Sequence, residues 1–200
     1  MAAEYGIDRT RTYLQGFSFG SGMTFVEGIT HPKLFAAISP NSGIGDFDPE
    51  VQAWVADLKA KGDVRLPTMV IYGSVDSASS TDGLIPAEGV LRNSINLLKT
   101  YNNIKATDKI SRFNSAYTAA YDVLTPGGKA SVSKPNAQYK ATAFNRYDYM
   151  SADPAPLPLL SWVWVTDMPH GTAPGQAELM WSYFKQWRRN PDGSLTYASR

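Results

Sequence analysis

Cysteine is absent from this chain of 200 residues, and neither sign of charge dominates it. Without cysteine there is no disulfide framework, and the sequence gives no indication of an oxidising or a reducing compartment. The 19 lysines and arginines nearly balance the 18 aspartates and glutamates, which leaves a formal net charge of +1. Because long basic runs are missing as well, we do not expect nucleic acid as a partner.

Long apolar runs are also missing, so no membrane span is expected. Residues 1–5 lack the basic and apolar regions of a signal peptide. If a preceding part of the chain has been lost, such a signal would have been lost with it, and the localisation therefore stays open. Zinc-ligand spacings, glycine-rich phosphate loops and nucleotide-binding fingerprints are absent, so we expect no cofactor and no metal.

The sequence does contain 43% apolar residues, enough to bury the core of one domain over residues 1–200. Strand-like and helix-like segments alternate, which predicts an α/β fold with a mostly parallel sheet and helices on both faces. Strands are expected at residues 10–14, 34–39, 66–72 and 160–166, and helices at residues 19–30, 48–62, 86–101 and 173–188. Helical spacing in the last helix predicts a core-facing side made of Ala177, Met180, Trp181, Phe184 and Trp187.

The most informative motif is a G-x-S-x-G pentapeptide at residues 16–20, between a predicted strand and a predicted helix. Such a nucleophile elbow holds a serine on a strained turn with its hydroxyl exposed. Its glycines let neighbouring backbone approach the turn closely. We therefore predict Ser18 as the nucleophile and the backbone N–H of Phe19 as a donor in the oxyanion hole. Ser21 and Ser42 are weaker candidates because neither lies at the centre of such a motif.

Only two histidines are available as a general base. His31 ends the predicted helix that follows Ser18, which puts it roughly 20 Å from the serine, beyond hydrogen-bond reach. His170 follows the strand predicted at residues 160–166, at the sheet edge where catalytic groups of α/β folds gather. His170 is therefore the predicted base.

The third member of a triad is a carboxylate that orients the imidazole. Asp76 is the best candidate because it follows the apolar strand predicted at residues 66–72 and a glycine turn. The chain order serine, acid, histidine is that of α/β-hydrolases and differs from the chymotrypsin and subtilisin orders. Asp46 and Asp48 are reserve candidates, although Asp48 also fits a helix cap. Asp82 lies in a polar loop that lacks the ligand spacing of a known metal loop.

Together these motifs resemble the C-terminal part of α/β-hydrolase esterases related to feruloyl esterases and polyhydroxybutyrate-depolymerase-like enzymes. The similarity is carried by residues 7–24, the turn at residues 72–76, and residues 168–171 with the helical stretch 180–184. It implies a serine esterase that uses two-step acyl transfer. The implied substrates are small or polymeric esters: short acyl, hydroxycinnamoyl or polyester compounds, including aromatic polyesters such as PET.

Such hydrolases normally have several strands before the nucleophile elbow, whereas seventeen residues precede Ser18 here. The resemblance implies that the missing strands would carry a second oxyanion donor, for which Gly73 with Ser74, or a group from a later insertion, could substitute. It also implies that the strand before Ser18 lies on an open sheet edge, which invites pairing with another copy. We therefore expect a homo-oligomer through this edge. An incomplete gene is the competing explanation.

Ninety-three residues separate Asp76 from His170, more than one crossover helix needs. We predict an insertion or lid at about residues 100–150. Its aromatic residues form either a wall over the active site that accepts an apolar acyl group, or an ordinary packed hairpin. These residues are Phe113, Tyr117, Tyr121, Tyr139, Phe144, Tyr147 and Tyr149.

Two other functions remain open at this point. The chain is alternatively a catalytically silent hydrolase domain that keeps the triad residues and acts as a module for binding or assembly. A thioesterase or a serine peptidase on the same fold would use the same three side chains. Turnover of ester, thioester and amide substrates separates these alternatives.

Overall fold

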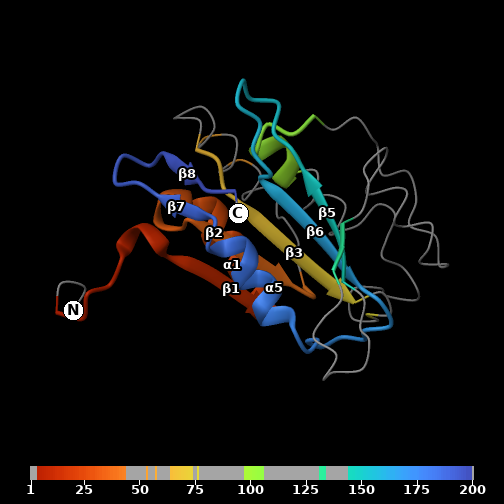
Figure 1. Cartoon of the computed structure of the whole chain (residues 1–200). Helices are drawn as coiled ribbons and strands as arrows, with labels where there is room; N and C mark the ends of the chain where they lie inside the picture. Colours follow the sequence, from red (N-terminus) through yellow and green to blue (C-terminus); the bar gives the residue numbers. More distant parts are fainter. Residues whose placement is uncertain are drawn as a thin grey trace.

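The computed structural model describes residues 4–43, 53, 57, 64–73, 76, 97–105, 131–133 and 144–199. A six-stranded sheet with the order β1-β2-β3-β6-β5-β4 forms its centre (Figure 1). The four parallel strands are β1 (Tyr13–Phe17), β2 (Ala37–Asn41), β3 (Thr68–Gly73) and β6 (Leu160–Val165). The antiparallel strands β5 (Phe144–Tyr149) and β4 (Ser131–Ser133) continue the sheet beyond β6. The predicted α/β class with a mostly parallel sheet is confirmed.

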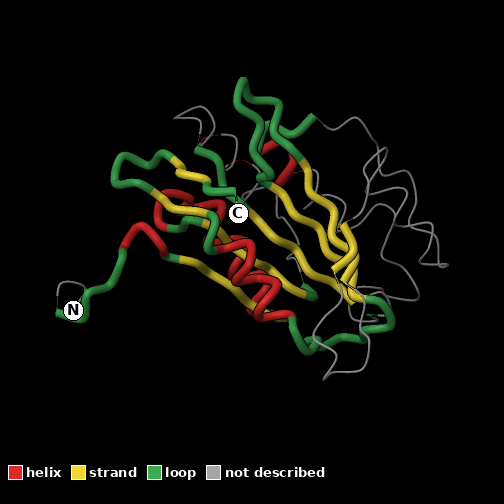
Figure 2. The backbone as a smooth tube through the Cα atoms, viewed as in Figure 1, coloured by secondary structure: helices red, strands yellow, loops and turns green. Residues whose placement is uncertain are grey.

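Helices α1 (Phe19–Thr30) and α5 (Gln176–Phe184) cover opposite faces of this sheet, whose strands run side by side in Figure 2. In β3, Val70 and Tyr72 belong to the core cluster that contains residues of α1, whereas Met69 and Ile71 belong to the cluster that contains residues of α5. Successive side chains of a strand point to opposite faces, so this alternation places one helix on each side. The apolar run that predicted a buried strand is therefore buried from both faces.

Two strands begin three residues later in the chain than predicted, and β3 begins two residues later. Before β1, the carboxylate of Asp8 accepts hydrogen bonds from the backbone N–H and the hydroxyl of Thr10, at 3.0 and 2.6 Å. These bonds cap a 3₁₀ turn, η1 (Arg9–Arg11), so that β1 begins at Tyr13. A second 3₁₀ turn, η2 (Pro32–Leu34), occupies the start of the segment predicted as a strand at residues 34–39, and β2 forms only from Ala37.

The predicted helix at residues 173–188 is wrong in its last turn. Helix α5 ends at Phe184, and the buried Trp187 lies on strand β7 (Trp187–Arg189), which pairs with β8 (Leu195–Tyr197). The Asn-Pro-Asp-Gly sequence at residues 190–193 is a turn signal that favours this hairpin. The predicted core face is also wrong at Trp181, which is 52% exposed, and at Ala177, which is exposed as well.

Part of the predicted insertion belongs to the main sheet. In β5, Phe144 is buried in the core cluster on the α5 side, whereas Tyr147 and Tyr149 pack against the cluster on the α1 side. Packing of this kind favours the packed-hairpin interpretation for these three aromatic residues. The other aromatic residues of the predicted lid, Phe113, Tyr117, Tyr121 and Tyr139, lie outside the described residues. Most of the helices predicted at residues 48–62 and 86–101 also lies outside them, although residues 53, 57 and 97–101 are helical.

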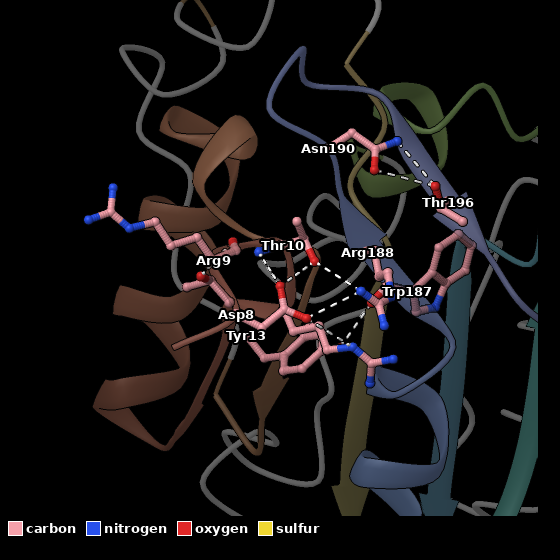
Figure 3. A network of polar contacts seen from close by, with 10 residues as sticks. Asp8, Arg9, Thr10, Tyr13, Trp187, Arg188, Asn190 and Thr196 are labelled. Atoms are coloured by element: carbon pink, nitrogen blue, oxygen red, sulfur yellow. Dashed lines mark hydrogen bonds and ion pairs between the residues drawn. The ribbon is translucent and has the colours of Figure 1, made fainter. Parts of the chain in front are cut away.

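The N-terminal segment is tied to the C-terminal hairpin by polar contacts (Figure 3). Arg188 of β7 donates to the carboxylate of Asp8 at 3.2 Å, and the hydroxyl of Tyr13 donates to the carbonyl oxygen of Trp187 at 2.9 Å. The side chain of Tyr13 also stacks on Phe184 of α5, with ring centroids 4.9 Å apart. These contacts join parts of the chain that are more than 170 residues apart and fix the start of β1. In the described part of the chain, no helix is long and apolar enough to cross a membrane.

A second polar cluster anchors the start of β3. Arg65 forms two hydrogen bonds with the carboxylate of Asp153, at 3.1 and 2.7 Å, and the side-chain amide of Asn103 donates to the same carboxylate at 2.7 Å. The hydrogen bond from Arg65 is the main cause that lowers the pKa of Asp153 from 3.8 to about 2, and the bond from Asn103 acts in the same direction. The ionised carboxylate is therefore favoured in the folded chain.

We expect the Asp153→Asn variant to have a lower Tm than the unchanged chain at pH 6, and the difference to shrink at pH 2. A carboxylate whose pKa is 3.8 in its ordinary state and about 2 when folded stabilises the fold above pH 3.8. This stabilisation is lost as the pH falls through about 2. Thermal melts of both proteins at the two pH values check the prediction, and a Tm difference that is equal at both would contradict it.

Candidate active site

The three residues predicted as a triad follow three parallel strands. Ser18 comes directly after β1, Asp76 comes three residues after β3, and His170 comes five residues after β6. Because the carboxyl ends of parallel strands lie at the same edge of a sheet, all three side chains start from one edge. The order of the strands, with β3 and β6 adjacent, places the aspartate and the histidine on neighbouring strand ends.

At this edge the three side chains form one continuous set of contacts. Nε2 of His170 lies 3.0 Å from Oγ of Ser18, and Nδ1 lies 3.1 and 3.2 Å from the two carboxylate oxygens of Asp76. A proton on Nδ1 suits the carboxylate partner and leaves Nε2 able to accept the serine proton. Asp76 is 2% exposed, whereas the His170 side chain is 29% exposed. The arrangement thus has a buried carboxylate, a partly exposed imidazole and a partly buried serine, in the sequence of contacts that proton transfer from a serine to a histidine requires.

The backbone of Ser18 has the strained conformation of a nucleophile elbow. Its φ of 54° and ψ of −120° lie in a region that residues with a side chain rarely adopt. Strain of this kind costs on the order of 1–3 kcal/mol. The surrounding structure enforces it: the N–H of Ser18 donates to the carbonyl oxygen of Asn41 in β2, and α1 begins at the next residue. Ser18 is the N-cap of α1 without a capping hydrogen bond from its side chain, so its hydroxyl is available to His170.

Of the two motif glycines, Gly16 is the one that the packing requires. A Cβ on Gly16 would collide with the carbonyl group of Gly20 and with the hydroxyl of Thr24, because α1 starts directly over the end of β1. A Cβ on Gly20 would meet nothing within 4 Å. The close approach predicted for the motif is therefore possible because Gly16 has no side chain, which lets the backbone of Gly20 pack against it.

Gly73, the last residue of β3, plays a similar part on the acid side. A Cβ at this position would collide with the carbonyl group of Met168, in the loop that carries His170. The absence of a side chain lets this loop lie against the end of β3, where the N–H of Asp76 donates to the carbonyl oxygen of Gly73 at 3.3 Å. Gly73 thus brings the aspartate and the histidine together. Ser74, considered with it as a substitute oxyanion donor, lies outside the described residues.

Phe19 is the first residue of α1, so its backbone N–H has no acceptor within the helix. The helix N-terminus also carries a partial positive charge next to Ser18. The side chain of Phe19 is 96% exposed, and that of Met23, one helical turn further on, is 62% exposed. A backbone donor and an exposed apolar surface therefore both adjoin Ser18.

The other sequence candidates lie away from this arrangement or outside the described residues. His31 is beyond the last residue of α1, where its Nδ1 lies 3.0 Å from the hydroxyl of Thr30 and 3.2 Å from a carboxylate oxygen of Glu27. Ser21 and Ser42 are both buried. The remaining candidates fall outside the described residues: Asp46, Asp48 and Asp82. Among the residues that the structure does describe, no group of three or more carboxylates and histidines is arranged to hold a metal ion.

Sequence reasoning missed one side chain at this site. The ring of Phe17, the last residue of β1, contacts the imidazole of His170, with centroids 4.8 Å apart and planes inclined by 35°. The available signal was its position, since Phe17 is the residue before the serine in the G-x-S-x-G motif. The contact itself depends on the path of the loop before His170, which the sequence pattern does not specify.

Comparison with known proteins gives a limited result. One solved structure that resembles part of the chain is a thermostable esterase, with 26% sequence identity and a TM-score of 0.31, covering 49% of this chain and 22% of that one. The chain thus spans less than a quarter of the length of that esterase. No protein-family model matches the chain. A search of curated proteins also finds no match.

We expect Gly16→Ala to lower the free energy of unfolding by about 1–3 kcal/mol, the usual range for a side chain forced into packed structure. Gly20→Ala is the matched control in the same motif, and we expect it to change this free energy by less than about 1 kcal/mol, because alanine favours helix and has open space. Urea denaturation of both variants measures the difference. Equal losses of stability would show that Gly16 is not specifically required.

Proposed function

We propose that the chain is a serine-dependent carboxylic ester hydrolase. The observation that carries this proposal is the unbroken set of contacts from Ser18 through His170 to Asp76. In this proposal Ser18 is the nucleophile, His170 the general base and acid, and Asp76 the residue that orients the imidazole. The choice of esters over amides rests on the resemblance of the sequence motifs to esterases, since the three side chains serve either reaction.

In the first half-reaction, Oγ of Ser18 attacks the carbonyl carbon of the ester while Nε2 of His170 takes the hydroxyl proton. Asp76 stabilises the resulting imidazolium through Nδ1. The oxygen that becomes negatively charged accepts a hydrogen bond from the N–H of Phe19 at the start of α1. When the tetrahedral intermediate collapses, the C–O bond to the alcohol breaks, His170 returns the proton to the alcohol oxygen, and the acyl group stays on Ser18.

In the second half-reaction, water replaces the alcohol. His170 takes a proton from the water as its oxygen attacks the acyl carbon, and the same Phe19 donor stabilises the second oxyanion. Collapse breaks the bond to Oγ, which recovers its proton from His170, and the carboxylic acid leaves. Because the His170 side chain is partly exposed and Asp76 is buried, we expect water to reach the imidazole while the carboxylate stays shielded.

We propose that the substrates are esters with an apolar or aromatic group, including hydroxycinnamoyl esters and polyesters. The exposed apolar surface beside Ser18 favours such substrates. Side chains on a helix lean toward its N-terminus. Met23 and Phe19 therefore lean toward the elbow from α1, and both are largely exposed. An apolar group of the substrate that covers them would remove apolar surface from water at about 25 cal/mol per Å².

The proposed function is tested with p-nitrophenyl esters of increasing acyl length. We expect measurable hydrolysis that rises with acyl length and that falls at least about 10³-fold in Ser18→Ala, the scale expected when a triad nucleophile is removed. Ser21→Ala is the matched control, because this buried serine lies on the same helix three residues further on. It should keep the activity of the unchanged chain.

The same assay discriminates the alternatives. Equal rates for the unchanged chain and Ser18→Ala would contradict the esterase proposal and favour a catalytically silent domain for binding or assembly. A thioester or an anilide in the panel that is turned over faster than every oxygen ester would instead assign a thioesterase or a peptidase. Each substrate reports on the same serine, so the Ser18→Ala variant accompanies all of them.

We also propose that the chain forms a homo-oligomer through β1. Within the described residues, β1 pairs with β2 on one side only, and its central residue Gln15 is exposed. A strand edge of this kind offers backbone donors and acceptors to a second copy. We expect light scattering after size exclusion to give at least twice the mass of one chain at micromolar concentration. The mass of a single chain at every concentration would contradict the proposal.

A further inference from the structure

The imidazole of His170 has three ring or polar partners in the described part of the chain. Two are the hydrogen-bond partners Ser18 and Asp76, and the third is the ring of Phe17. The centroids of the two rings are 4.8 Å apart and their planes are inclined by 35°. This separation is too short for two such rings to meet edge to edge, so the phenyl ring lies tilted and partly over the face of the imidazole. This contact has no part in the proton transfers of the proposed reaction.

The two hydrogen bonds leave one rotation of the imidazole weakly restrained. Both act in the plane of the ring and point outward from Nδ1 and Nε2, in nearly opposite directions. Tilting of the ring about the line through these nitrogens, by combined rotation about the Cα–Cβ and Cβ–Cγ bonds, changes neither hydrogen bond much. A contact with the face of the ring opposes this rotation directly, because tilting the imidazole pushes its carbon atoms into the phenyl ring or away from it.

The backbone around Phe17 holds its ring in place for this contact. Tyr13 and Phe17 are four residues apart on β1, so both side chains leave the strand on the same face. Tyr13 stacks on Phe184, which identifies this face as the one that α5 covers. The loop that carries His170 leads into α5. Directly after Phe17, the N–H of Ser18 donates to the carbonyl oxygen of Asn41, which fixes the end of the strand.

We propose that Phe17 is a positioning residue for His170, which holds the imidazole in the plane where it meets Ser18 and Asp76 at once. The negative face of the phenyl ring also favours the positive charge that the imidazole gains when it takes the serine proton. The role of Phe17 in turnover rests on the proposed esterase function. The restraint on the ring does not, and it is measurable without any substrate.

The kinetic test compares Phe17→Leu with Phe17→Tyr. Leucine keeps apolar bulk but has no ring face, so we expect kcat to fall about 2- to 10-fold, the rate equivalent of one aromatic pair. KM should change less than twofold, because Phe17 is proposed to contact the histidine and not the substrate. Tyrosine keeps the ring face and should restore kcat. A role in stability alone predicts no such separation of kcat from KM and no rescue by tyrosine.

Tyr13→Leu is the matched control. It removes a ring from the same strand and the same face, together with the hydrogen bond to Trp187, yet Tyr13 has no contact with His170. We expect this variant to lower Tm with kcat unchanged. A kcat that falls equally in Tyr13→Leu and Phe17→Leu would assign the loss to a weakened strand and would overturn the proposal. An unchanged kcat in Phe17→Leu, or a loss that Phe17→Tyr shares, would also overturn it.

The second measurement uses no substrate and relies on the two histidines of the chain. In NMR spectra, the ring protons of His170 should be displaced by the ring current of Phe17. In Phe17→Leu this displacement should disappear and the signals should broaden as the imidazole tilts, whereas His31, at the end of α1, serves as the unchanged reference. Unchanged His170 signals in Phe17→Leu would overturn the proposal. If Ser18→Ala shows that the chain is not an esterase, these signals alone decide whether Phe17 restrains the imidazole.

Discussion

The hydrogen bond between His170 and Ser18 joins residues 152 positions apart, and most of the fold serves to bring them within 3.0 Å. The two residues follow strands that are not adjacent, because β2 and β3 lie between β1 and β6. A bond of this length between separate strand ends requires all four parallel strands to keep their register, since a slip of one residue moves a strand end by about 3.3 Å. The buried core on both faces of the sheet supplies that constraint.

Close backbone contacts concentrate at the ends of the strands that precede Ser18 and Asp76. The starts of α1 and of the His170 loop press against strand ends at Gly16 and Gly73, where any side chain would collide with a carbonyl group. The strained backbone conformation of Ser18 lowers the free energy of unfolding by on the order of 1–3 kcal/mol. Burial of one large apolar side chain offsets a similar amount, about 1.5–3 kcal/mol. Because Phe25 and Ile29 of α1 are both fully buried, packing of the helix outweighs the strain of the turn that starts it.

The candidate site was more predictable from the sequence than the ends of several helices and strands. The bounds of α1 and the positions of Ser18, Asp76 and His170 followed from a local motif, a scarcity of histidine and the topology of parallel sheets, which are strong constraints. The C-terminal hairpin was missed because Trp187 continues the helical spacing of the aromatic residues before it. In the structure Trp187 lies on strand β7, where its side chain is equally well buried, so the spacing did not distinguish the two structures. The contact of Phe17 with His170 depends on the path of a loop, and no local rule encodes it.

The strand before Ser18 is held at both ends by contacts outside the sheet. In the described part of the chain, β1 has one neighbour in the sheet, so half of its backbone groups lack the ladder that fixes a central strand. Two other restraints act on β1: α1 packs over its carboxyl end through Gly16, and the contacts of Asp8 and Tyr13 with β7 hold its amino end.

Among the contacts at the amino end of β1, an exposed ion pair such as Asp8 with Arg188 contributes little on its own. The stacking of Tyr13 on Phe184 and its hydrogen bond to a backbone carbonyl are the stronger part of this anchor, because both are better shielded from water. Aromatic packing therefore holds the amino end of β1, and the steric contact of α1 with Gly16 holds the carboxyl end, where Ser18 follows.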